Sequence, residues 1–265
     1  MTKIIGILNL TLDSFSDGGL YYDLNSAKQH ISEMIDFGAD VIDVGAESTR
    51  SGFSDVSHID QIKTLEPVID FINKNYDISV SIDTRSSRVI QYFKKNKISF
   101  VNDVSSGLND EKMLECVAES SCNYIMTHMP DEHKEGSIKK YGDILSELDS
   151  FFRERIEACI KAGIKKEKIV IDPGIGFGKS GDDNIKIMKN LDYILNIHSN
   201  ICIGTSNKRF SSKLFDGIET KNDLKVANLA SFAISALKGA TYLRVHDVAV
   251  TKDTILVIEK SQSVM

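Results

Sequence analysis

Tryptophan is absent from this chain of 265 residues, and proline occurs only three times. The four cysteines (Cys116, Cys122, Cys159 and Cys202) form no C-x-x-C pair, which argues against a structural zinc site and a disulfide framework. No apolar run is long enough to span a membrane, and no signal peptide precedes the first apolar segment. We therefore expect a cytoplasmic protein in a reducing compartment.

An excess of positive charge is also missing. Lysine and arginine number 32 against 38 aspartates and glutamates, which gives a net charge of −6. This balance favours neither a nucleic-acid nor an anionic-membrane partner. The length and the apolar fraction of 42% predict one domain over residues 1–265 with an ample core.

Eight short apolar runs recur along the chain, and each is followed by a helical pattern. Most are rich in β-branched residues and lack polar alternation, as is typical of parallel strands buried on both faces. The predicted strands are Ile4–Leu10, Val41–Ala46, Ser79–Asp83, Phe100–Val104, Tyr124–His128, Ile169–Asp172, Ile201–Gly204 and Tyr242–Val245.

The clearest amphipathic helices are predicted at Ser26–Phe37, Leu148–Ala162 and Lys221–Lys238, and a glycine suited to a C-terminal cap follows each. Eight strand–helix units without a break in composition predict an α/β fold of the (β/α)₈, or TIM-barrel, type. A doubly wound open sheet is the alternative. It usually has fewer strands, and no G-x-G-x-x-G follows the first strand here.

In such barrels the active site lies at the carboxyl ends of the strands. Polar residues occupy this place on every predicted strand, so we expect them to meet at one rim. They are Asn9, Glu47, Asp83, Asn102, Asp103, His128, Asp172, Ser206, Arg244, His246 and Asp247. For Glu47, Asp103 and Asp247 an alternative stays open, in which they are buried groups that brace neighbouring strands.

Asp83, Asn102 and Asp172 form a hydrogen-bonding set in which two carboxylates accept and one amide both donates and accepts. Such a set suits a flat heterocycle with an amino-pyrimidine edge. Lys208 would donate to the carbonyl side of that ring. Glycosidases also use two carboxylates, but sugar sites usually stack on tryptophan, which this chain lacks.

Cationic side chains make the same rim positive within an acidic protein. They are Arg50, Lys208, Arg209, Arg244 and His246. This pattern indicates an anionic group, most simply phosphate or pyrophosphate. The spacing of Arg244 and His246 places both on the same side of the last strand.

Two further patterns need separate interpretations. The segment Gly178-Lys179-Ser180 resembles the end of a P-loop. Pro173 stands where that motif needs its first glycine, so we reject a P-loop. The long segments Thr11–Tyr22 and Thr49–Ser57 predict lids that order on ligand binding. The lone His30, His58 and His198 are expected on solvated helix faces.

The motifs together resemble the dihydropteroate synthase family from the first strand to the last. They are Gly6–Asn9, Asp13–Gly19, Glu47–Arg50, Ser81–Thr84, Asn102–Val104, Asp172–Lys179 and Arg244–Asp247. The resemblance implies a (β/α)₈ barrel, usually a homodimer. It also implies condensation of 6-hydroxymethyl-7,8-dihydropterin pyrophosphate with p-aminobenzoate, with release of pyrophosphate. This reaction belongs to folate biosynthesis and is the target of sulfonamides.

The resemblance also implies residue roles and an SN1-type mechanism. The pterin would contact Asp83, Asn102, Asp172, Lys208 and Arg244, and the pyrophosphate would contact Asn9, Arg244 and His246. Mg²⁺ would bind near Asn9, with Asp17 close by. The p-aminobenzoate side and lids would comprise Phe15, Asp17, Thr49, Arg50, Phe177 and Arg209. The catalytic set would be Asp83, Asp172, Lys208, Arg244 and His246.

Several positions depart from the family pattern. Leu12 and Ser51 replace prolines, Ala46 replaces a glycine, Thr127 replaces a methionine, and Asn207 and Arg209 alter the order of residues around Lys208. Because Ser51 and Arg209 belong to the p-aminobenzoate side, we expect altered, weakened sulfonamide binding. Two other functions stay open: a methyltetrahydrofolate-type methyltransferase and a non-catalytic pterin-binding protein. Neither needs the pyrophosphate-side residues.

Overall fold

A computed structural model of the chain describes residues 2–10, 24–47, 56–130, 138–206 and 221–263, with residues 221–223 described by backbone alone. Eight parallel strands lie within these residues. They are β1 (Lys3–Asn9), β2 (Val41–Gly45), β3 (Ser79–Asp83), β4 (Phe100–Asp103), β5 (Asn123–Thr127), β6 (Ile169–Asp172), β7 (Cys202–Ile203) and β8 (Tyr242–Val245).

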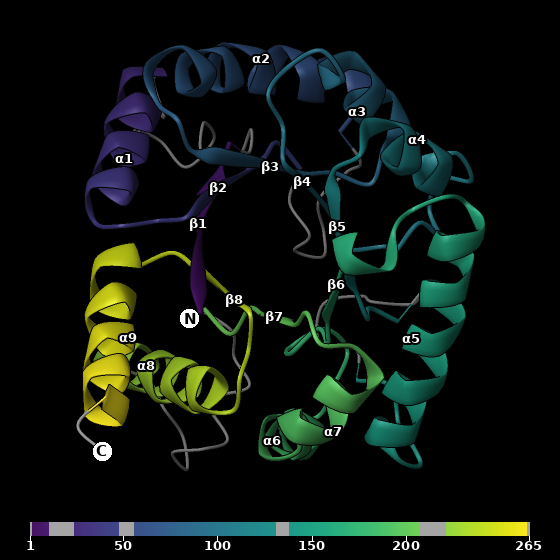
Figure 1. Cartoon of the computed structure of the whole chain (residues 1–265), viewed down its shortest axis with the longest axis vertical. Helices are drawn as coiled ribbons and strands as arrows, with labels where there is room; N and C mark the ends of the chain where they lie inside the picture. Colours follow the sequence, from purple (N-terminus) through teal and green to yellow (C-terminus); the bar gives the residue numbers. More distant parts are fainter. Residues whose placement is uncertain (1, 11–23, 48–55, 131–137, 207–220, 264–265) are drawn as a thin grey trace.

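The strands close into a barrel with helices outside it (Figure 1). Their order is β6-β5-β4-β3-β2-β1-β8-β7, and one isolated bridge between Ile171 and Ile201 joins β6 to β7. This closure confirms the predicted (β/α)₈ barrel and excludes the open sheet.

The helices follow the predicted pattern, with small shifts at their ends. They are α1 (Leu24–Asp36), α2 (His58–Asn75), α3 (Ser87–Phe93), α4 (Met113–Ser120), α5 (Ile144–Lys161), α6 (Gly181–Lys189), α7 (Leu191–Ile197), α8 (Lys221–Leu237) and α9 (Val248–Ser263), with a short 3₁₀ turn at Lys166–Lys168. Helix α5 begins earlier than predicted because Asp143 caps it, accepting from the backbone N–H groups of Leu145 and Ser146. None of the described helices is long and apolar enough to cross a membrane.

The predicted glycine caps are confirmed at three helix ends. Gly38, Gly163 and Gly239 have φ of +91°, +101° and +94°, and the N–H of each bonds to a carbonyl in the last turn of the preceding helix. An L-residue with a side chain rarely adopts this left-handed conformation.

The core has two parts. The larger part lies between the outer faces of the strands and the helices, and a smaller cluster fills the lower part of the lumen. The lumen cluster comprises Ile5, Val41, Phe100, Ile125, Val170 and Cys202, with Tyr242 packed against it. The barrel is therefore blocked at its amino-terminal end, and a ligand has access only from the other end.

The strand register decides which polar side chains reach the lumen. Paired residues of parallel neighbours point to the same face, and the pairs Ile7–Asp43, Asp83–Asn102 and Thr127–Asp172 belong to the same alternation as the lumen cluster. Beyond the apolar cluster, the polar lumen-facing residues are Asn9, Asp43, Ser81, Asp83, Asn102, Thr127, Asp172 and Arg244. With Ile7 as an apolar exception, the upper lumen is therefore mostly polar.

One histidine prediction is wrong. His198 is buried, and its Nε2 lies 2.7 Å from the backbone oxygen of Ile169. It does not lie on a solvated helix face because α7 ends at Ile197 and the chain turns back there towards β7. His30 and His58 are half-buried.

Candidate active site

Arg244 from β8 reaches across the polar lumen. Its Nε donates to Asp43 Oδ2 at 2.7 Å and its Nη2 donates to Asp83 Oδ2 at 2.6 Å. Burial opposes the positive charge, but the two carboxylates outweigh this effect and raise the pKa of Arg244. A charged guanidinium therefore stands among the residues that the sequence predicts as pterin contacts.

Asp43 is a site residue that the sequence analysis missed. It is completely buried, and its Oδ2 also accepts from Asn102 Nδ2 at 3.0 Å. The available signal was a carboxylate in the middle of an apolar strand, Val-Ile-Asp-Val-Gly, where an ionisable group is costly unless it has partners. Asp43 lies within β2 and not at its carboxyl end, so the pattern of polar strand ends does not include it.

Asp83 lies nearer the rim, with a side chain that is 15% exposed. Burial raises the pKa of Asp83 to about 7; Arg244 lowers it, and the charges of Asp43 and Glu47 add to the rise. Gly45 lies beside the Asp83 side chain, and a Cβ on Gly45 would lie 3.2 Å from Asp83 Cβ. Because burial disfavours the charge of Asp83, a further hydrogen-bond donor would stabilise its carboxylate.

Asp172 ends β6, and the following loop fixes its orientation. Its Oδ1 accepts from the backbone N–H of Gly174 at 2.8 Å. Gly174, Gly176 and Gly178 all have positive φ, and a Cβ on Gly174 would lie 2.0 Å from the His128 carbonyl oxygen. The alternating glycines are therefore required by backbone geometry.

Lys179 shows that the loop is not a P-loop. Its buried Nζ donates to the carbonyl oxygens of His128 and Gly174 at 2.9 Å each and of Phe177 at 3.2 Å. The three donors of the ammonium group thus bond to backbone, and the lysine ties β5 to the loop after β6. Phe177 itself is half-buried.

Asn9 and His246 lie at the ends of neighbouring strands β1 and β8. Both residues are exposed, and His246 Nδ1 lies 2.9 Å from Ser206 Oγ. They form the rim next to Arg244 where the sequence predicted an anion. Among the described side chains, no group of three His, Cys, Asp or Glu could hold a metal ion.

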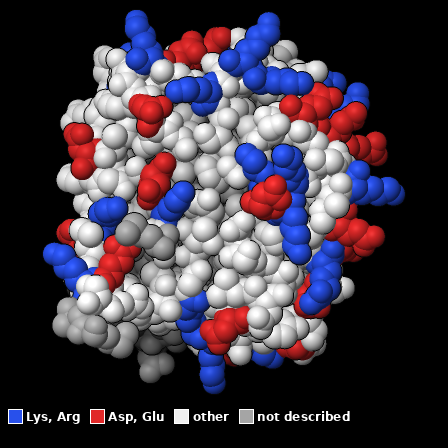
Figure 2. Space-filling view, viewed as in Figure 1, with Lys and Arg blue, Asp and Glu red and all other residues white. Residues whose placement is uncertain are grey.

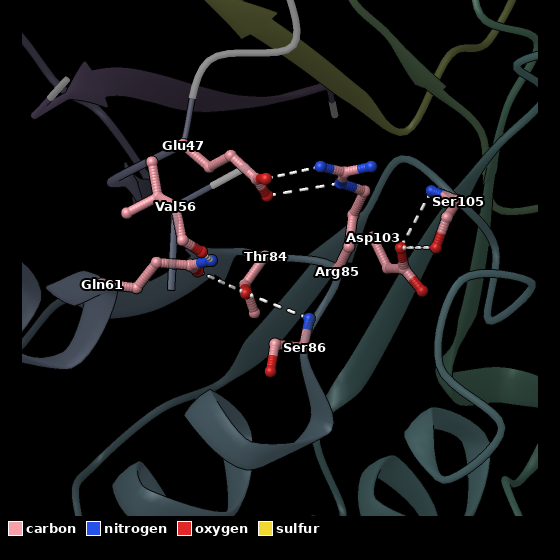
Figure 3. Close-up of polar contacts among 8 residues, drawn as sticks. All are labelled: Glu47, Val56, Gln61, Thr84, Arg85, Ser86, Asp103 and Ser105. Carbon is pink, nitrogen blue, oxygen red and sulfur yellow. Dashed lines mark hydrogen bonds and ion pairs between the residues drawn. The ribbon is translucent and has the colours of Figure 1, made fainter. Parts of the chain in front are cut away.

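The bracing alternative is confirmed for Glu47 and Asp103. Figure 3 shows Arg85, from the loop after β3, paired with Glu47; its Nε lies 3.3 Å from Glu47 Oε2. Asp103 faces away from the lumen and accepts from the backbone N–H groups of Ser105 and Gly107 and from Tyr124 Oη. For Asp247 the alternative is wrong, because its side chain is half exposed and pairs with Lys225 at the surface.

A second part of the network in Figure 3 involves Gln61 of α2. Its Nε2 donates to the Val56 carbonyl at 3.0 Å, and its Oε1 accepts from Thr84 Oγ1 at 2.7 Å. Glu47 and Val56, which flank residues 48–55, are therefore both attached to the neighbouring loop after β3.

Several predicted site residues lie outside the described part of the chain. They are Phe15, Asp17, Thr49, Arg50, Lys208 and Arg209, together with the departures Leu12, Ser51 and Asn207. Thr127 is described; it is buried on the lumen side beside Asp172. The structure thus brings together Asp83, Asn102, Asp172 and Arg244, with Asn9 and His246 at the rim.

Comparisons with known proteins agree with this site. The family model described as "Pterin binding enzyme" matches residues 5–246. The dihydropteroate synthase of Streptococcus pyogenes serotype M6 is 37% identical over 257 residues, covering 97% of this chain and 94% of the relative. That of Escherichia coli K12 is 35% identical over 261 residues, covering 98% and 92%.

Solved structures are similar over the whole chain. Xanthomonas albilineans dihydropteroate synthase with 4-aminobenzoic acid has a TM-score of 0.91 at 33% identity, covering 100% of this chain and 94% of that chain. The same enzyme in complex with 7,8-dihydropteroate has a TM-score of 0.87 at 32% identity, covering 100% and 95%. From the barrel, its polar lumen and these similarities, the chain belongs to the dihydropteroate synthase family of pterin-binding enzymes.

Proposed function

We propose that this protein condenses 6-hydroxymethyl-7,8-dihydropterin pyrophosphate with p-aminobenzoate to give 7,8-dihydropteroate and pyrophosphate, in folate biosynthesis. One observation carries the proposal. Hydrogen-bonding groups of Asp83, Asn102 and Asp172 share a closed-bottomed lumen with Arg244, directly below an exposed rim that includes His246. This arrangement suits a flat, donor-rich heterocycle that carries an anionic group on the rim side.

The geometry supports the following division of roles. The two carboxylates and the amide orient the pterin by its N–H groups. Lys208 lies outside the described residues, and its role as a donor to the ring oxygen is proposed from the sequence. Arg244 and His246 stabilise the departing pyrophosphate as the carbon–oxygen bond breaks. The carboxylates favour the positive charge that develops on the pterin-methyl group, and the aryl amine then attacks this carbon and loses a proton. No side-chain nucleophile is required.

We further propose Mg²⁺ as the cofactor, with Asn9 as its protein ligand. The exposed amide oxygen of Asn9 at the rim fits a cation that usually keeps several waters and binds substrate phosphates through few protein ligands. When bound, Mg²⁺ would neutralise charge on the pyrophosphate. Asp17 is a further candidate ligand from the sequence.

A homodimer is proposed from the outer face of α8. Val226, Ile234 and Leu237 are 48%, 44% and 56% exposed, and Ala230 lies exposed among them. Helix α9 packs beside α8 and exposes Val257. An apolar stripe of this kind is suited to the same stripe on a second copy. A cytoplasmic location fits the four cysteines, all of which are free thiols.

We also propose weakened sulfonamide binding. It rests on Ser51 and Arg209, which stand on the expected p-aminobenzoate side in place of the family residues. If these changes act selectively on the drug, we expect a sulfonamide to compete with p-aminobenzoate less strongly in this protein than in a family member with the usual residues.

One assay tests the proposed reaction, its cofactor and the response to sulfonamides. Purified protein is given both substrates, with and without Mg²⁺, and pyrophosphate and dihydropteroate are measured; we expect both products, dependent on Mg²⁺. Pterin binding without product would instead indicate a non-catalytic pterin-binding protein, and methyl transfer from methyltetrahydrofolate would indicate the methyltransferase. Sulfonamide inhibition is read in the same assay, and inhibition as tight as in a family member with the usual residues would refute the weakened binding.

A further inference from the structure

Asp43 contacts two of the proposed substrate-binding residues and is more deeply buried than either of them. Its Oδ2 accepts from Arg244 Nε at 2.7 Å and from Asn102 Nδ2 at 3.0 Å. These three residues come from β2, β8 and β4, so the contacts cross the lumen. We propose that Asp43 is a positioning residue that fixes how Asn102 and Arg244 meet the pterin substrate.

The argument for Asn102 follows from hydrogen-bonding chemistry. A guanidinium has donors only, so Asp43 Oδ2 acts as an acceptor towards Arg244. The group of Asn102 that faces the same oxygen must then be its NH₂, whichever way the amide is drawn. The Asn102 oxygen is consequently turned away from Asp43 and is available as an acceptor, in line with the acceptors of Asp83 and Asp172.

The argument for Arg244 concerns its two carboxylate partners. Asp83 is nearer the rim and would be engaged by the substrate, whereas Asp43 is fully buried below it. When a pterin draws on the Asp83 carboxylate, the Nε contact to Asp43 still holds the guanidinium plane, and Nη2 is released towards the anionic end. Asp43 would therefore hold the guanidinium of Arg244 in one position while Arg244 contacts both the pterin ring and the pyrophosphate.

Two buried atoms beside this contact also point to a ligand. Asp43 Oδ1 and Ser81 Oγ have no hydrogen-bond partner in the described part of the protein. Asp43 and Ser81 are register neighbours on β2 and β3, and both face the lumen. Buried polar atoms are normally hydrogen-bonded, so we expect a polar ligand atom or a water to bond to these two atoms at the bottom of the polar lumen.

The inference rests on the proposed function, and the test separates the two. Steady-state kinetics of the wild-type protein are compared with Asp43→Asn, which keeps the shape but removes the acceptor-only carboxylate. We expect KM for the pterin pyrophosphate to rise about 10- to 100-fold, the range for one charge-assisted hydrogen bond, with KM for p-aminobenzoate unchanged. Equal increases in both values would mean general loosening of the site and would overturn the inference.

A double-mutant cycle removes the ambiguity of a poorly folded variant. Dissociation constants of 6-hydroxymethylpterin are measured for wild type, Asp43→Asn, Asn102→Ala and the double variant, all checked by thermal unfolding. If Asp43 acts through Asn102, its substitution should weaken binding much less in the Asn102→Ala background. Additive effects would overturn the positioning role. An inactive wild type would refute the proposed function, while this binding cycle would still decide the inference.

The control variant is Asp103→Asn. Asp103 is a buried carboxylate like Asp43, but it faces away from the lumen and accepts from Ser105, Gly107 and Tyr124. We expect this variant to leave pterin affinity unchanged. A loss of pterin affinity equal to that of Asp43→Asn would attribute the effect to the loss of any buried carboxylate and would overturn the inference.

Discussion

The ammonium group of Lys179 lies in the interior and is bonded to three backbone carbonyls. A lysine is rarely buried so fully, and its replacement would remove one donor from each of three backbone carbonyls, of which Gly174 still accepts from the Phe177 N–H. We predict that Lys179→Met lowers the free energy of unfolding by about 2–4 kcal/mol, measured by urea denaturation.

Lys186→Met is the matched control, because Lys186 is half exposed and forms a surface ion pair with Asp143 at 2.7 Å. Exposed pairs contribute roughly 0–1 kcal/mol, so this variant should be nearly as stable as the wild type. Similar losses in both variants would contradict the special role of the buried ammonium group.

His128 provides a pH-dependent contribution to stability. Burial lowers the pKa of His128 to about 3, and the charges of Lys179 and Lys139 act in the same direction. In the unfolded chain its pKa is about 6.5, so between these values the unfolded state binds the extra proton. Stability from this residue is therefore complete above pH 6.5 and is lost as the pH falls towards 3.

We predict that His128 lowers the free energy of unfolding by about 2 kcal/mol when the pH falls from 8 to 5, because the contribution is roughly 1.4 kcal/mol per pH unit below 6.5. Urea denaturation at both pH values measures this for wild type and His128→Gln. The variant should lose less stability over this range, while the buried His198, whose pKa burial also lowers, contributes equally to both. Identical pH dependence would show that His128 is not the group responsible.

Among the elements, the loop from Gly174 to Gly178 is the most constrained by backbone geometry. Gly174 has φ of +66°, and a Cβ there would collide with the His128 carbonyl. We predict that Gly174→Ala displaces the loop and breaks the contact from the Gly174 N–H to Asp172. The variant should have a lower free energy of unfolding. Its kcat/KM for the pterin substrate should fall by at least about tenfold.

Gly163→Ala tests whether strain alone explains that result. Gly163 also has a positive φ, +101°, but a Cβ there meets nothing closer than Ala118 at 3.6 Å, and the residue caps α5 away from the site. It should lose about 1 kcal/mol of stability with unchanged kcat/KM. If Gly174→Ala also kept full activity, the loop would not position Asp172.

The strands and helices are the features of this molecule that the sequence predicted well. Buried parallel strands have a plain signature, and glycine caps such as Gly38 and Gly163 follow from backbone conformation alone. The contacts of Asp43 with Asn102 and Arg244 could not be predicted, because they cross the lumen between strands that are not neighbours. Such contacts depend on how the closed barrel staggers its strands. The role of Lys179 was hidden for a similar reason, since its partners are backbone oxygens.

At the scale of the whole molecule, charges of both signs are intermixed on the face shown in Figure 2, without one large patch of a single sign. This face offers little basis for charge-driven association, and the apolar stripe on α8 is our candidate interface. We predict that Leu237→Asp converts a dimer to a monomer, measured by analytical ultracentrifugation, because a carboxylate would be buried without a partner.

Val257→Asp offers a comparison on α9, whose exposed apolar side chain lies beside the same stripe. Tyr92→Asp, on the far side of the barrel, should leave the dimer intact. A wild-type protein that is monomeric at micromolar concentration, or a Leu237→Asp variant that remains dimeric, would refute an interface on α8.

Among the described residues a single bridge joins β6 to β7, and this has a consequence for how the barrel opens. Every other neighbouring pair is joined by two or more register pairs, so local unfolding should begin at this seam, where amide hydrogens would exchange with solvent soonest. Asp172 stands on one side of the seam and Arg244, beyond β7, on the other. A substrate that contacts both residues would hold β6 and β7 together. The least stable pairing in the sheet would then be the one whose amide hydrogens substrate binding protects from exchange.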